Sequence, residues 1–140
     1  MKIHTISPYQ TTAEDFFTKL LDWDVDLVLD VRLHNTNQLA GFSKRDDLDY
    51  FVRTITKAKY IYDATFAPSQ DILSPYLKKQ MSWEDFYKAY GEELEKYKLV
   101  PQFLALYGSY KNIAIVGTGT KERHSHVVVL ADAIEKAVSE

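Results

Sequence analysis

Two mostly aliphatic runs constrain the fold of this chain more than any other feature. They are VDLVLDVRL, at 25–33, and KNIAIVGTG, at 111–119, and each passes into a polar, turn-forming loop. Strands with apolar residues on both faces are typical of the parallel sheets of α/β proteins, which helices cover on both sides. The sequence therefore predicts buried parallel strands over 25–32 and 112–117, lying next to each other or nearly so.

Helical patterns fill the intervals between the strand-like runs. The segments 2–7 and 58–64 predict two further strands. Thr12 caps a predicted helix over 13–22, whose apolar face would hold Phe16, Phe17, Leu20 and Leu21. Other helices are predicted over 46–57, 67–80 with an interruption near Pro75, 82–97, 100–110 as a short helix or turn, and 126–140. This order predicts one three-layer α/β domain over 1–140, with a mostly parallel central sheet of about four strands and helices on both faces.

Composition narrows the classes of function. A net charge of -3 argues against nucleic acid or an anionic membrane as partner, because those partners select a basic surface. The absence of cysteine excludes disulfides, thiolate nucleophiles and cysteine-bound metals. The N-terminus lacks an apolar signal core, and no run is long enough to cross a bilayer. We therefore expect a soluble, cytoplasmic protein.

An aromatic stripe runs along the predicted helix 82–97. Trp83, Phe86, Tyr87, Tyr90 and Leu94 share a broad helical face. We expect core packing, with Trp83, Phe86 and Tyr90 largely buried. If exposed, the stripe would instead serve as an interaction surface for a partner.

Polar residues follow the strand predicted over 25–33. Asp30 and Arg32 are two residues apart and so face the same side of the strand, followed by a loop that contains His34, Asn35, Asn37 and Gln38. The pair could anchor this loop as an ion pair, or it could hold a polar ligand together with Asn35. Because a charge at a strand end is not part of the core, Arg32→Ala is expected to leave the fold intact.

The glycine-containing loop after the last strand, 117–124, is the second candidate site. It is neither a dinucleotide fingerprint, because its sixth position is Glu122, nor a P-loop, which ends in Gly-Lys-Ser/Thr. Such a strand–loop–helix transition could still receive a phosphate or carboxylate through backbone N–H groups and cations. The candidate ligand-binding residues here are Gly117, Thr118, Gly119, Thr120 and Lys121. A simple turn with solvated charges is the alternative.

The sequence HSH at 124–126 offers little for metal or nucleophilic chemistry. His124 and His126 supply two ligands, whereas a zinc site needs at least three from the protein, so we expect no metal. Ser125 is an awkward nucleophile because a triad base normally comes from another part of the chain. The sequence does not identify a cofactor.

The chain resembles the family catalogued as domain of unknown function 488. The resemblance is carried by HTIS at 4–7, LVLDVRLHNTNQLAGFSKRDDL at 27–48 and AIVGTGTKERHSHVVVLADAI at 114–134. The DVR of the family falls on residues 30–32, its loop aromatic within 35–42, and its late Cys-His-Arg on residues 125–127. Its Cys-x-Glu falls on residues 117–119. Of these late residues only His126 is kept, so the resemblance implies a fold and a site location but excludes thiol chemistry.

Two functions are compatible with these residues. The first is a domain that binds a small anion or a phosphate-containing ligand at the carboxyl ends of the strands, with a degenerate site. The second is an enzyme that uses His126 as acid or base, with Asp30 and Arg32, on a phosphorylated or nucleotide-like substrate. In both, the loop 117–124 would lie beside Asp30 and Arg32, with His126 at the wall of the pocket. A purely structural or interaction role is the third option.

Overall fold

A computed structural model describes residues 1–33 and 38–139 and contains one parallel sheet. Its strands lie in the order β1-β4-β2-β3, with bounds β1 Lys2–Ile6, β2 Leu27–Asp30, β3 Lys59–Tyr62 and β4 Asn112–Val116. β2 pairs with β4 in parallel, with Leu27 opposite Ile113 and Asp30 opposite Val116. The prediction that the two aliphatic runs form neighbouring buried parallel strands is confirmed.

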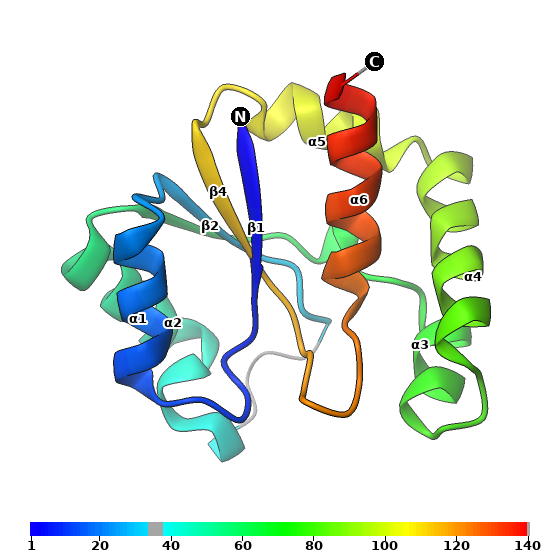
Figure 1. The fold of residues 1–140 in the computed structure, drawn as a ribbon, viewed down its shortest axis with the longest axis horizontal. Coiled ribbons are helices and arrows are strands. Elements are labelled where there is room, and N and C mark those ends of the chain that lie inside the picture. Colours follow the sequence, from blue (N-terminus) through cyan, green and yellow to red (C-terminus); the bar gives the residue numbers. More distant parts are fainter. Residues whose placement is uncertain (34–37, 140) are drawn as a thin grey trace.

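Helices cover both faces of this sheet, as predicted for a three-layer α/β fold. Figure 1 shows α1 and α2 on one side of the strands, and α4, α5 and α6 on the other. The helices are α1 Ala13–Asp22, α2 Arg45–Phe51, α3 Gln70–Leu77, α4 Trp83–Lys96, α5 Leu99–Tyr107 and α6 His126–Ser139. Shorter helical segments are η1 Gln38–Ser43, η2 Val52–Thr56, which is a π-helix, and η3 Ala64–Phe66.

The strand residues alternate between two apolar cores, one on each face. Val28 and Val116 pack with the core on the α1 side, whereas Leu29 and Ile115 pack with the core under α4 and α6. This alternation follows from the two-residue period of a strand. Both faces of β2 and β4 are therefore buried, which explains the continuous aliphatic character of these segments.

The predicted helices needed several corrections. Thr12 does cap α1, but Leu21 is 51% exposed because it lies about 100° around the helix from the buried Leu20. Pro75 lies inside α3, which ends at Leu77, instead of interrupting the helix. The helix predicted over 46–57 changes from α-helix to π-helix after Phe51.

Helix α4 confirms most of the prediction for the aromatic stripe. Phe86 and Tyr90 are fully buried, whereas Trp83 is half-buried and Tyr87 is exposed. The half-buried Trp83 ring contacts the ring of His124, in the loop before α6. Among the described helices, none is long and apolar enough to span a membrane.

Candidate functional site

Asp30 and Arg32 form a buried ion pair at the end of β2. The Arg32 Nε and Nη2 groups donate to the two Asp30 carboxylate oxygens at 2.9 and 2.8 Å. Asp30 is fully buried and Arg32 is 1% exposed. The expectation that Arg32 is a charge outside the core was therefore wrong. The two-residue spacing places both side chains on one side of the chain, and that side faces inward.

Further hydrogen bonds surround this ion pair. Arg32 Nη2 donates to the Ser43 carbonyl at 2.6 Å, and the Tyr60 hydroxyl donates to Asp30 Oδ2 at 2.5 Å. Burial alone would lower the pKa of Arg32, but its bonds to Asp30 outweigh burial and raise that pKa above its ordinary value. Burial and the charge of Asp30 also raise the pKa of Tyr60. Arg32 is thus a fixed cation whose bonds to Asp30 and Ser43 lie inside the protein.

His126 connects the start of α6 to the end of β2. Its Nε2–H donates to the Val31 carbonyl at 3.0 Å, and its ring meets Tyr90 edge to face. Because a carbonyl only accepts, Nε2 carries the proton. His126 is 3% exposed, and burial lowers its pKa to about 4. The imidazole is therefore neutral at pH 7 and is held away from solvent.

The glycine loop is tightly folded onto the start of α6. A Cβ at Gly117 would overlap the Ser125 Oγ and the Val127 side chain. Ser125 Oγ also accepts from the Thr118 N–H at 3.1 Å, and the Thr120 N–H donates to the Arg123 carbonyl at 2.9 Å. The N–H groups that were expected to receive an anion are thus bonded within the protein at positions 118 and 120.

The loop after β1 closes against the glycine loop. Ser7 Oγ donates to the Gly119 carbonyl at 2.6 Å, and the Lys121 N–H donates to Gln10 Oε1 at 2.7 Å. The two bonds join segments that are more than a hundred residues apart in the sequence. They hold the two loops side by side at the carboxyl ends of β1 and β4.

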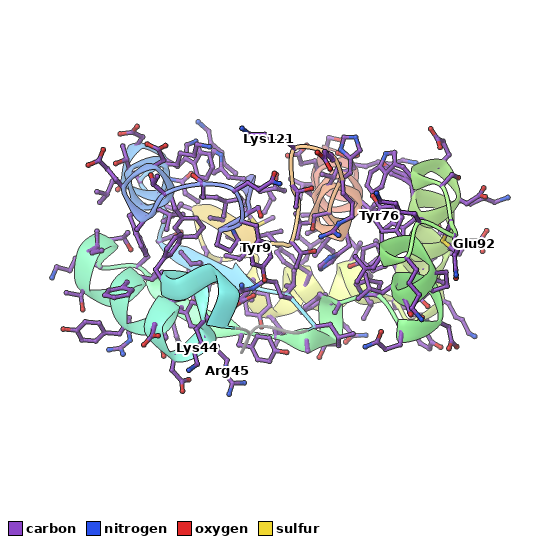
Figure 2. The ribbon with its side chains drawn as sticks, turned by 90° about the horizontal axis from the view of Figure 1, so that it is seen from below. Tyr9, Lys44, Arg45, Tyr76, Glu92 and Lys121 are labelled. Atoms are coloured by element: carbon purple, nitrogen blue, oxygen red, sulfur yellow. The ribbon has the colours of Figure 1, made fainter. Side chains whose placement is uncertain are left out.

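Two joined hollows lie where these loops meet. The first, of about 320 Å³, is lined by Thr5, Ile6, Ser7, Tyr9, Gln10, Thr11, Lys19, Gly119, Thr120 and Lys121. The second, of about 180 Å³, shares five of these residues and adds Arg123, His124, Ser125, Val127 and Val128. Figure 2 looks onto this end of the molecule, with Tyr9 near its centre and Lys121 at its periphery.

The sheet topology explains why hollows form at this place. β1 and β4 are neighbours, but β1 leads into α1 on one face and β4 leads into α6 on the opposite face (Figure 1). Loops that leave adjacent parallel strands in opposite directions open a crevice between them, which is where open α/β sheets bind ligands. The hollows occupy that crevice.

The lining of the hollows includes only some of the residues proposed from the sequence. Gly119, Thr120 and Lys121 line them, whereas Gly117 and Thr118 do not. Asn35 lies outside the described residues. The buried residues Asp30, Arg32 and His126 are not in the lining.

Tyr9 connects the buried ion pair to the first hollow. Its hydroxyl accepts from Arg32 Nη1 at 3.4 Å, and Tyr9 itself lines the hollow. Sequence reasoning missed Tyr9, together with Ser7, Gln10, Thr11 and Lys19. The signal was present for the loop 7–12, because it also follows a parallel strand and precedes a capped helix. Within the described chain, no three His, Asp or Glu side chains gather in a way that could hold a metal ion.

Comparison with known proteins identifies a family. The family model described as "Domain of unknown function DUF488" matches residues 12–134. No curated protein matches the chain. No solved structure matches it either.

Proposed function

The chain belongs to the family described as domain of unknown function DUF488, and we propose that it binds a small anion or a phosphate-containing ligand in the joined hollows between β1 and β4. The charge of the lining is the observation that carries this proposal. Lys19, Lys121 and Arg123 line the hollows, and no described lining residue is acidic. In a chain with a net charge of -3, such a local excess of cations favours an anionic ligand.

Hydroxyl groups beside these cations suit a phosphate or a carboxylate. Thr120 Oγ1 accepts from the Glu122 N–H at 3.3 Å, so the hydroxyl proton of Thr120 remains available to donate. Arg123 Nη2 donates to the Thr118 carbonyl at 3.0 Å, which fixes the guanidinium beside the second hollow. Charged donors and hydroxyls together are the groups that hold phosphate oxygens in proteins.

The buried residues have a supporting role in this proposal. Asp30 and Arg32 are bonded to each other at the end of β2, Arg32 also donates to Tyr9 in the loop after β1, and His126 joins the start of α6 to Val31. The geometry favours binding over acid–base catalysis by His126, because its Nε2–H is bonded to Val31 and its pKa of about 4 keeps it neutral at pH 7.

Thermal unfolding in the presence of inorganic phosphate tests the proposal. A ligand that binds only the folded state raises the melting temperature by mass action, and the rise should be lost in a Lys19→Ala/Lys121→Ala variant. Lys88→Ala is the matched control, because Lys88 is an exposed lysine on α4 that does not line the hollows. Phosphate also stabilises proteins non-specifically, but that effect is common to both variants. Equal phosphate-induced shifts in the two variants would refute the proposal.

A further inference from the structure

We propose that the ligand is nucleotide-like, with a phosphate in the cationic hollows and a flat aromatic base stacked on the ring of His124. This inference rests on the proposed anion site and adds a second point of recognition to it. His124 is exposed and lines the second hollow beside Arg123.

One face of the His124 ring is already covered by protein. The Trp83 ring lies against it, with ring centroids 4.7 Å apart and planes tilted by 33°. His124 nevertheless remains exposed, so part of its side chain is accessible to a ligand. Bases stack on aromatic side chains of this kind because every base has a π-face.

Aromatic residues packed behind His124 hold this residue in place. The Tyr76 hydroxyl donates to the His124 carbonyl at 2.8 Å and fixes the backbone, and Figure 2 shows Tyr76 pointing toward the loop before α6. Tyr76 in turn stacks on the fully buried Phe86 at 4.2 Å, and Trp83 packs against the same Phe86 at 5.9 Å. Because the His124 side chain is already supported in this way, it loses little conformational entropy when a ligand stacks on it.

The two recognition elements lie within reach of one ligand. His124 follows Arg123 directly in the chain, and the hollow that both line shares Gly119 and Thr120 with the hollow lined by Lys121. A free phosphate would fill only the cationic part, and a free nucleoside would contact only the ring. A nucleoside monophosphate joins both groups in one molecule, so it should bind more tightly than either part.

Calorimetric titration with adenosine monophosphate, ribose 5-phosphate and adenosine tests this inference. Loss of one stacking contact weakens base binding by about 5-fold to 150-fold. The parent protein should bind the monophosphate tighter than ribose 5-phosphate by a factor in this range. His124→Ala should remove that difference without changing the affinity for ribose 5-phosphate, and His124→Phe, which keeps a ring, should restore it.

Tryptophan fluorescence supplies an independent readout. The chain has two tryptophans, so Trp23→Phe leaves Trp83 as the only reporter, directly behind His124. The monophosphate should change its emission saturably, whereas ribose 5-phosphate should not.

The outcomes separate the two proposals. Equal binding of the monophosphate and ribose 5-phosphate overturns the stacking inference but keeps the anion site. Failure of both phosphates to bind overturns the anion site and this inference with it. Adenosine binding as tightly as the monophosphate also overturns both, because the phosphate would then contribute nothing.

Discussion

Arg32 donates two hydrogen bonds to Asp30 inside the protein, with Nε and Nη2 lying 2.9 and 2.8 Å from the two carboxylate oxygens. Removing one member of such a pair leaves the other as an unpaired buried charge, which costs about 3–5 kcal/mol. Arg32→Ala should therefore lower the free energy of unfolding by about that amount, as measured by urea denaturation.

An exposed ion pair gives the matched control for Arg32. Arg53 Nε lies 2.7 Å from Asp49 Oδ1 on the surface, and pairs of this kind contribute about 0–1 kcal/mol. Arg53→Ala should therefore have a much smaller effect. If the two variants lose similar amounts of stability, the Asp30–Arg32 pair does not anchor the fold.

A substitution at Tyr60 tests the buried ion pair without altering the lining of the hollows. The Tyr60 hydroxyl donates to Asp30, but Tyr60 does not line the hollows. Tyr60→Phe should cost about 1–3 kcal/mol of stability, because a buried carboxylate loses a donor. Its affinity for phosphate, measured by calorimetry at a temperature where the variant is fully folded, should equal that of the parent. A large loss of affinity would mean that Asp30 takes part in binding directly.

Stability should fall as His126 is forced to accept a proton. Burial lowers the pKa of His126 in the folded protein to about 4, below the ordinary value of 6.5. The contribution of the neutral His126 to stability is therefore present above pH 6.5 and is lost as the pH falls toward 4. The free energy of unfolding should fall by about 2 kcal/mol between pH 7 and pH 5. Urea denaturation at both pH values should show this loss in the parent.

His126→Gln isolates this effect, because glutamine keeps an N–H donor for Val31 but does not titrate. The pKa of His4 is also lowered, with burial as the main cause, but His4 is present in both proteins and its contribution cancels in the difference. An equal pH dependence in parent and variant would contradict the assignment of His126 as a buried neutral side chain.

Gly117 should resist substitution, whereas Gly119 should tolerate it. A Cβ at Gly117 would overlap Ser125 Oγ and Val127, and overpacking of this kind costs about 1–3 kcal/mol. At Gly119 the nearest atom to an added Cβ is 3.4 Å away, which is an ordinary contact. Thermal unfolding of Gly117→Ala and Gly119→Ala should therefore differ by several degrees. Equal melting temperatures would show that the loop relaxes freely.

The sequence predicted the layers of the fold because its strongest signals were local. The runs at 25–33 and 111–119 are aliphatic on both faces, and that pattern alone indicates buried parallel strands. The carboxyl ends of these strands then indicated the region of the site. That residues 1–140 form a single domain stays a prediction.

The lining of the site could not be predicted in the same way, because it depends on contacts between distant segments. β1 lies at the sheet edge beside β4, which brings Ser7 to Gly119 across 112 positions of the chain. Local patterns carry no information on such a pairing. Similarly, the spacing of Asp30 and Arg32 shows that they share a side but not whether that side faces the ligand or the core.

Backbone amide NMR during a titration with inorganic phosphate is the most direct test of the anion site between β1 and β4, because it reports where the anion binds. The proposed anion site predicts saturable shifts of the amides of the loops 7–11 and 119–124, which line the hollows, and loss of these shifts in the Lys19→Ala/Lys121→Ala variant but not in Lys88→Ala. Saturable shifts confined to another part of the protein, or no saturable shift at all, would contradict it.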